Sequence, residues 1–539
     1  MLIDIEDGTE VPGVDDGEAG SAVARALRAA WSGADPGAAT RPRPAAGRRW
    51  SGPRVLLRRG EPSGIGALLD LALAGDPERV QGGVRLRRVP SAGGRYPVEA
   101  HVVADGRAWR YDPVDHALAV PVDGGGGGAP GSGGGVPPPG GGGTTVVLSL
   151  VPQRTVWRYG KRSLPVLLLD LGHAIGALLA AAPVAGYAAR AEIGRPARGL
   201  AAEAALPWRD GAVRWPGAAP EYPLAAVRLD PVRSRPAFPD RSGAPVHHAD
   251  PSGVPARAAY PSGSPVRPRY EHPGGADAPG SAPIPGAGGA GPGSEPALHA
   301  SLADAVRVVE DALAELGEGA PEGVDFAAPA QAPPVAAVLE RCSSPWEEIT
   351  AAAGASGRGG PPVERAPAPG SVPGGPRPPS ADRPGPPSPP APPEQERSPG
   401  APPEQSRSSG SPSGGPVDPA DAARARIGAD RVVAVRPAGV PGLGEALAPR
   451  SCGQPVVAEA AHLLLLLGAP ESEPDPWRAL AEHVGAGIAA HEAWLWATGQ
   501  GRAVRPAGCW IDAVLAAGER RGRLIHSLAI GDIDIHQGL

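Results

Sequence analysis

Two stretches of this chain carry apolar residues at the spacing of one helix face. In the first, leucine and isoleucine recur every three or four residues from Leu164 to Ile175 and beyond, and Gly186 predicts the helix end. In the second, Asp475 and Pro476 form a favourable N-cap and first-turn pair, apolar residues follow at helical spacing, and Gly499 predicts the end. The pattern therefore predicts two long helices.

The two predicted helices belong to segments with the same plan. Gly172 to Gly186 spans fourteen residues, and so does Gly485 to Gly499. Each helix is followed later by a short apolar strand, at 222–227 in one case and 526–530 in the other. This repetition predicts a duplicated α+β unit, with a chance agreement of two helix lengths as the alternative.

Stretches rich in glycine, proline and serine interrupt these patterns. The chain has 79 Gly and 72 Pro among 539 residues, and only 4% of its residues are aromatic. Such segments bury too little apolar surface to offset the loss of chain entropy. We expect a disordered N-terminus at 1–19 and a disordered linker at 233–296. We also expect disordered insertions at 122–143 and 361–417. The folded halves are then residues 20–232 and 297–539.

Charge and cysteine content argue against several classes of function. The net charge is −6 and Lys161 is the only lysine, with no basic stripe of the kind that binds nucleic acid. The N-terminal segment is acidic, and the leucine run 463–467 is too short to cross a bilayer. Three widely spaced cysteines predict neither a disulfide framework nor a zinc site, and the pair His247-His248 lacks further ligands. We expect a cytoplasmic protein with no membrane segment and no metal.

The residues VPSAGGRYPV at 89–98 predict a binding turn. Pro90, Ser91, Ala92 and Gly93 form a small-residue turn ahead of an alternating apolar stretch. Without bulky side chains, the backbone N–H groups and the hydroxyl can approach a polar ring edge or a phosphate. A plain turn before a strand is the alternative interpretation.

A loop with arginine precedes a predicted helix in each half. Arg58 and Arg59 come before the first such helix, and Arg341 and Ser343 come before the second, at 346–353. A guanidinium beside the free N–H groups of a helix start predicts a phosphate seat. Solvated arginines near an N-cap are the alternative.

These segments together resemble the nitroreductase superfamily of flavin enzymes, and most closely its SagB-type dehydrogenases of thiazole- and oxazole-modified ribosomal peptides. In the first half the similarity rests on the Arg58-Arg59 loop, the segment 90–103, the strand 109–113 and the segment 157–182, which reads WRYGKRSLPVLLLDLGHAIGALLAAA. In the second half it is fainter and covers 338–345, 475–499 and 526–531. The resemblance implies an α+β, nitroreductase-like fold in two tandem copies that form a pseudodimer.

The resemblance also implies FMN, bound where two α+β units meet. In the family, one unit supplies the arginine loop and the other supplies the Pro-Ser turn. Here the second half has the segment 423–444 in place of that turn, so we expect one flavin site. One assignment pairs Arg341 and Ser343 with the turn residues Pro90, Ser91, Ala92 and Gly93. The other keeps Arg58 and Arg59 as phosphate ligands.

The reaction that the resemblance implies is the FMN-dependent oxidation of peptide thiazolines or oxazolines to azoles, as in thiopeptide biosynthesis. A base removes a ring proton, and a hydride leaves to the flavin. Tyr159 is the candidate base, because nearby cations such as Arg158 can lower the pKa of a tyrosine. The family commonly has Lys-Tyr where this chain has Arg158-Tyr159. Lys161 could replace that lysine, but in a strand it would face the same side as Tyr159, so its position differs from that of the family's lysine.

The implied partners are a precursor peptide and a cyclodehydratase complex, with a homodimer as the alternative to an intrachain pseudodimer. Two other functions stay open. The first is an NAD(P)H-dependent nitro or quinone reductase of the same fold. The second is a non-catalytic scaffold subunit of a peptide-modifying complex.

Overall fold

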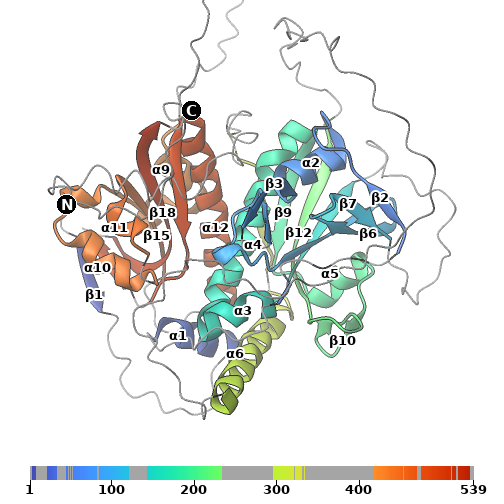
Figure 1. The fold of residues 1–539 in the computed structure, drawn as a ribbon, viewed down its shortest axis with the longest axis horizontal. Coiled ribbons are helices and arrows are strands. Elements are labelled where there is room, and N and C mark those ends of the chain that lie inside the picture. The colour runs from blue at the N-terminus through green and yellow to red at the C-terminus, as the bar shows by residue number, and fades with distance from the viewer. Residues whose placement is uncertain are drawn as a thin grey trace, which may run out of the picture.

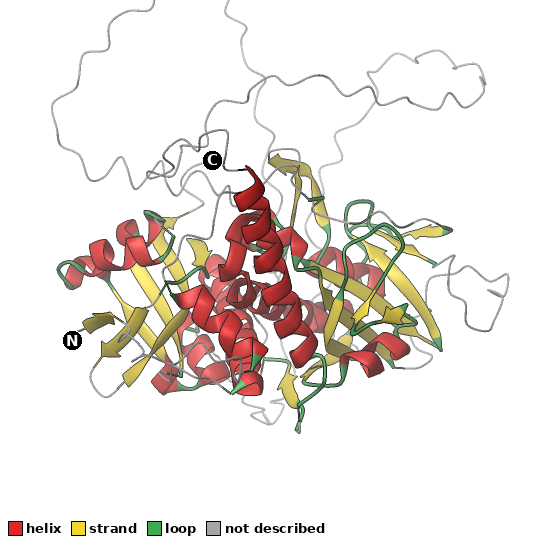
Figure 2. Ribbon diagram, turned by 90° about the horizontal axis from the view of Figure 1, so that it is seen from below, coloured by secondary structure: helices red, strands yellow, loops and turns green. Residues whose placement is uncertain are grey.

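Two β-sheets with a pair of long helices between them form the body of the protein in this computed structural model (Figures 1 and 2). The structure describes residues 3–7, 21–32, 44–45, 48, 50–120, 143–232, 295–329, 333 and 417–534, with short breaks at 51, 82–83, 321, 453, 470–474, 512 and 518–519. Nearly all of the expected linker and of both expected insertions lies outside the described residues.

The first sheet has eight strands within the described residues, in the order β13-β9-β12-β8-β5-β6-β7-β2. Their bounds in chain order are β2 Arg54–Leu56, β5 Val98–Ala104, β6 Arg107–Asp112, β7 Ala117–Ala119, β8 Thr144–Leu150, β9 Tyr187–Ile193, β12 Tyr222–Pro231 and β13 Val324–Ala327. Two small hairpins accompany it, β3 Gly75–Gln81 with β4 Val84–Arg87 and β10 Trp208–Arg209 with β11 Ala212–Val213.

The second sheet has six strands in the described part of the chain, in the order β1-β17-β18-β15-β14, with β16 also paired to β18. Their bounds are β1 Ile3–Asp7, β14 Val432–Val435, β15 His462–Gly468, β16 Arg502–Ala507, β17 Ala513–Ala517 and β18 Arg520–Asp534. The leucine run at 463–467 is thus the buried centre of β15.

The helices lie between and beside the sheets. Their bounds are α1 Ala22–Trp31, α2 Gly64–Ala72, α3 Gln153–Tyr159, α4 Ser163–Ala185, α5 Ala197–Glu203, α6 Glu295–Leu316, α9 Pro419–Ile427, α10 Leu443–Arg450, α11 Val456–Glu459 and α12 Pro476–Gly499. Short 3-10 turns are η1 Ala92–Gly94, η2 Gly160–Arg162, η4 Ala429–Arg431 and η5 Pro437–Gly439.

Both long helices form where the sequence predicted them. Gly186 ends α4 in the left-handed conformation with φ of 87°, which favours glycine. Asp475 caps α12 by accepting hydrogen bonds from the N–H groups of Trp477 and Arg478. The stretch Gln153–Ala185 is long and apolar enough to cross a membrane, but its most apolar window is entirely buried. A buried core helix passes the same test, so this stretch is weak evidence for a membrane segment.

The two sheets repeat one topology. The order β9-β12-β8-β5 in the first sheet matches β16-β18-β15-β14 in the second, and every one of these pairs is antiparallel. The helix α4 lies between β8 and β9 in the chain, and α12 lies between the equivalent strands β15 and β16. This agrees with the predicted duplication of an α+β unit.

The helices α4 and α12 meet at a reciprocal glycine contact. A Cβ atom on Gly172 would lie 2.3 Å from the carbonyl oxygen of Val484, and one on Gly487 would lie 2.5 Å from that of Leu169. Gly172 therefore contacts the residue three positions before Gly487, and Gly487 contacts the residue three positions before Gly172. The structural equivalent of Gly172 is Gly487, so the register predicted from Gly485 and the fourteen-residue spacing is wrong by two residues.

Each half also carries an edge strand of the other sheet. Strand β1 pairs with β17, where Ile5 faces Leu515, although we expected disorder at 1–19. Strand β13 pairs with β9, where Phe326 faces Ala191. Buried side chains of α12 and α6 also belong to the same apolar cluster as α4. The boundary expected at residue 297 therefore does not separate two independent cores.

One expectation about the cysteines is wrong. Cys452 and Cys509 form a disulfide, although the sequence predicted no disulfide. They lie 57 residues apart in the chain, and their Cα atoms are 6.2 Å apart, within the range that such a bond requires.

Candidate functional site

The small-residue turn is held against α4 by Asp170. The Ser91 hydroxyl donates to Asp170 Oδ2 at 2.6 Å, and the Ala92 N–H donates to Oδ1 at 3.1 Å. The N–H of Tyr96 in turn donates to Ser91 Oγ at 2.8 Å. One carboxyl group therefore fixes both the side chain and the backbone of the turn.

Asp170 itself is buried in the middle of α4, with only 4% of its surface exposed. Burial raises the pKa of its carboxyl group to about 7, while the hydrogen bonds from Ser91 and Ala92 act in the opposite direction. Sequence reasoning placed Asp170 only as a helix residue. The available signal was a lone carboxylate within an otherwise apolar helical run.

The side of the turn that faces α4 is closed. The cavity bounded by Pro90, Ser91, Tyr96, Asp170 and Ala174 has a volume of about 10 Å³, which suffices for about one water molecule. The α4 side of the turn therefore has no room for a flat cofactor.

On that other side the turn lies against the end of α3. Gly93 has φ of 59°, and a Cβ atom there would lie 3.1 Å from both the Tyr159 hydroxyl and Arg158 Cδ. Arg95 Nε donates to the Gly93 carbonyl oxygen at 2.8 Å, and its guanidinium stacks on Trp157. The positive φ favours glycine at position 93, and a Cβ there would press on Tyr159 and Arg158.

The structure corrects two expectations about Tyr159. It is the last residue of α3 rather than a strand residue. Burial raises the pKa of the Tyr159 hydroxyl, and the charge of Arg158 only partly counteracts this, so the expected net lowering of the pKa is wrong. Arg505 of β16, in the second half, interacts electrostatically with Tyr159.

The other predicted cations lie elsewhere or are engaged. Lys161 lies in η2, and its Nζ pairs with Asp304 of α6 at 2.8 Å, so the shared strand face with Tyr159 does not exist. Arg58 and Arg59 are both exposed, and Arg59 donates to Asp70 at 3.0 Å and to the Gly75 carbonyl oxygen at 2.8 Å. Arg341, Ser343 and the helix expected at 346–353 lie outside the described residues.

Cationic and polar groups of the kind that bind an anionic cofactor lie around the turn. Arg158 and the Tyr159 hydroxyl pack against Gly93, and Arg505 interacts electrostatically with Tyr159. A flat ring placed against Gly93 would therefore displace the side chains of Arg158 and Tyr159. The structure thus brings together the turn, Arg158 and Tyr159, and adds Arg505 and Asp170, which the sequence did not single out.

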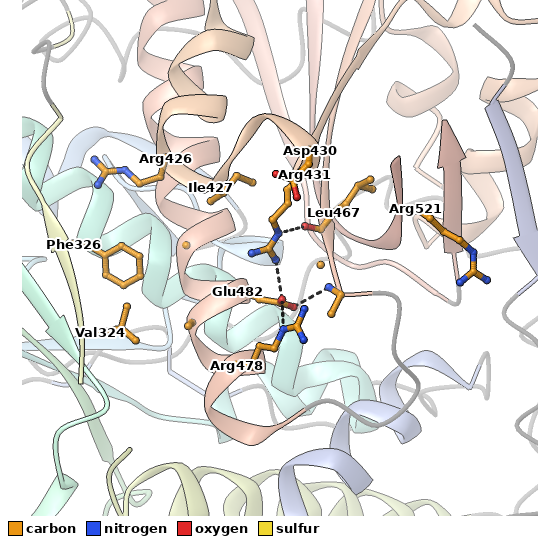
Figure 3. A pocket seen from close by; sticks show the side chains of 14 residues that line it. Val324, Phe326, Arg426, Ile427, Asp430, Arg431, Leu467, Arg478, Glu482 and Arg521 are labelled. Atoms are coloured by element: carbon orange, nitrogen blue, oxygen red, sulfur yellow. Dashed lines mark hydrogen bonds and ion pairs between the residues drawn. The ribbon is translucent and has the colours of Figure 1, made fainter. Parts of the chain in front are cut away.

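A second site occupies the equivalent place in the other half. A cavity of about 440 Å³ lies between β13 and the α9, β15 and α12 segments (Figure 3). Since Gly172 matches Gly487, Gly485 in its wall is the counterpart of Asp170. The segment Ile427 to Arg431 stands before β14, as the Pro-Ser turn stands before β5.

Charged side chains fill one wall of this cavity. Glu482 pairs with Arg431 and Arg478 at 3.1 Å each and accepts from the Ala469 N–H at 3.0 Å. Arg426 pairs with Glu492 and donates to the Ala327 carbonyl oxygen of β13 at 2.9 Å. Here a glycine stands in place of Asp170, and arginine–glutamate pairs line the wall instead of a Ser–Asp contact.

Comparisons with known proteins give similarities of structure only. No family model matches the sequence, and no curated protein matches it. A structure assigned to a nitroreductase from Anabaena variabilis is 12% identical, with 95% of this chain and 99% of that chain covered and a TM-score of 0.49.

Two further structures match smaller parts of the chain. One, assigned to a nitroreductase from Ralstonia eutropha, is 18% identical over 36% of this chain and 88% of that chain, with a TM-score of 0.23. The other is the E. coli microcin synthetase McbBCD complex with truncated pro-MccB17 bound, 19% identical over 35% of this chain and 70% of that chain, with a TM-score of 0.24. The protein has a mixed helix and sheet fold. Identities and TM-scores as low as these do not assign it to a family.

Proposed function

We propose that the protein is an FMN-dependent oxidoreductase that oxidises peptide thiazolines or oxazolines to azoles. The observation that carries this proposal is the packing of Arg158 and the Tyr159 hydroxyl against Gly93 in the first half. Arg505 of the second half interacts electrostatically with Tyr159. The sequence resemblance to SagB-type dehydrogenases supplies the substrate class.

Each residue has a distinct task in this proposal. Asp170 is a positioning residue, because it orients Ser91 and the Ala92 N–H and does not itself face the second half. Gly93 keeps a side chain out of the turn, Arg158 and Arg505 would hold the anionic groups of the cofactor, and Arg341 and Ser343 would be its phosphate ligands. FMN, when bound, supplies the two-electron acceptor.

Tyr159 is the proposed proton acceptor for the ring Cα–H. Burial raises the pKa of its hydroxyl, whereas the neighbouring charge of Arg158 acts to lower it. Arg158 therefore favours the phenolate that the reaction requires, and burial opposes it. Arginine cannot itself serve as the base because it stays protonated.

The test is turnover on a cyclised peptide. We expect purified protein to remove two hydrogens from each azoline ring, detected by mass spectrometry, in the presence of dioxygen and without NAD(P)H. Rapid flavin reduction by NAD(P)H with no effect on the peptide would instead identify a nitro or quinone reductase.

One observation favours a scaffold as the second candidate function. The hydroxyl of Ser91 and the N–H of Ala92 both donate to Asp170, so neither is directed to a ligand in this structure. A scaffold would be colourless and would still co-purify with a cyclodehydratase.

A further inference from the structure

The disulfide joins an exposed cysteine, Cys452, to a buried one, Cys509. Cys452 lies just after α10 and is exposed, whereas Cys509 lies between β16 and β17 and is 5% exposed. An incoming thiol can therefore reach Cys452, while Cys509 is shielded. This asymmetry is typical of a reactive cysteine with a resolving partner.

A cation from the other half lies beside the exposed sulfur. Arg162 Nη1, in η2, is 3.9 Å from Cys452 Sγ. A guanidinium near a sulfur favours its thiolate form, and the thiolate is both the leaving group and the nucleophile of thiol–disulfide exchange. Arg162 belongs to the first half, so this contact joins the two halves.

We propose that Cys452 and Cys509 form a thiol–disulfide exchange site for a low-molecular-weight thiol. A thiolate attacks Cys452 Sγ, the bond to Cys509 breaks, and Cys509 leaves as a thiolate that takes up a proton. A second thiol attacks the mixed disulfide at the sulfur of the bound small thiol and releases Cys452 as a thiolate. Two small thiols are oxidised to one disulfide, and the protein disulfide is reduced to two thiols.

Reduction of this disulfide would affect contacts near the place where Arg162 of the first half contacts Cys452 of the second half. The segment after α10 is also fixed by the Ile511 N–H, which donates to the Arg450 carbonyl oxygen at 2.8 Å. The carbonyl oxygen of Ala507, two residues before Cys509, accepts from Trp510 Nε1 at 2.7 Å. Reduction removes the covalent tie and leaves these hydrogen bonds. The proposal does not depend on the flavin reaction.

The test uses the full chain in buffers of reduced and oxidised glutathione, followed by acid quenching, alkylation and peptide mass spectrometry. We expect Cys452 and Cys509 to become alkylated together, in one two-electron transition, as the buffer is made more reducing. A pair that stays oxidised at every glutathione ratio, or two thiols that titrate independently, would overturn the proposal.

Two variants separate the exchange chemistry from a change in folding. Cys509→Ser should leave Cys452 able to form a mixed disulfide with glutathione, seen as added mass on the Cys452 peptide. In reduced protein, Arg162→Gln should slow alkylation of Cys452 several-fold at neutral pH, whereas Arg424→Gln, on α9, is the matched control. Equal alkylation rates in both arginine variants, with circular dichroism unchanged, would contradict the role of Arg162.

Discussion

The Nε2 atoms of His173 on α4 and His526 on β18 lie 2.8 Å apart and join the two halves inside the protein. His526 Nδ1 lies 3.1 Å from the carbonyl oxygen of Ala507, so this nitrogen carries the proton and donates. The Nε2 atom of His526 is then the acceptor, and His173 is the donor. Burial lowers the pKa of His526 to about 4, which keeps it neutral at pH 7.

Replacing His526 by leucine should destabilise the protein, because the N–H of His173 loses its acceptor while buried. A buried donor without a partner costs about 1–3 kcal/mol. Urea unfolding at pH 7 should show that His173→Leu together with His526→Leu costs less than the two single changes added. Strict additivity would contradict a direct hydrogen bond between them.

The carboxyl group of Asp170 should make stability depend on pH. Its pKa is raised to about 7 in the folded protein, so its contribution is fully present below about pH 4 and is lost as the pH rises to about 7. Asp170→Asn should therefore become more stable relative to wild type over this window, by an amount approaching about 4 kcal/mol.

The measurement is the free energy of unfolding in urea at several pH values. The exposed substitution Asp210→Asn is the matched control. A constant difference between Asp170→Asn and wild type from pH 4 to pH 7 would show that the carboxyl group is not perturbed by its surroundings.

An alanine at Gly172 or Gly487 should force α4 and α12 apart. The added Cβ would lie 2.3 Å from Val484 O in one case and 2.5 Å from Leu169 O in the other. We expect each to cost about 1–3 kcal/mol or more, as overpacking does. The control is Gly199→Ala in α5, where no atom lies within 4 Å of the new Cβ and where alanine should stabilise the helix by about 0.5–1 kcal/mol. Comparable thermal unfolding of Gly172→Ala and Gly199→Ala would contradict the close helix contact.

Tyr159→Phe should abolish most azole formation while flavin stays bound. General base catalysis contributes about 100- to 10,000-fold, so turnover should fall at least to that extent. Because burial raises the pKa of Tyr159, wild-type turnover should rise with pH above neutrality, and this rise should be missing in the variant. Unchanged turnover in Tyr159→Phe would remove this residue from the reaction.

The local elements of this fold could be predicted from the sequence, whereas its long-range pairings could not. Periodicity and caps located α4 and α12 because those signals lie within the helix itself. The exchange of β1 and β13 between sheets depends on partners hundreds of residues away, and so does the contact between Gly172 and Gly487. The periodicity of one segment carries no information about a partner so distant in the sequence.

The candidate site divides in the same way. The turn at Pro90 to Gly93 was visible because its small residues interrupt the apolar pattern. The position of Tyr159 was mistaken because apolar and polar residues near it do not separate a short helix from a strand. Arg505 could not be found at all, since only the packing of one half on the other brings it to Tyr159.

The most direct test is the amount of FMN released per polypeptide from purified full-length protein, measured by absorbance after denaturation. We predict one FMN per chain in wild type and less in Arg505→Gln, because we propose that Arg505 of the second half helps to hold the flavin. No flavin, or two per chain, would contradict a single cofactor held between the turn at Gly93 and the second half.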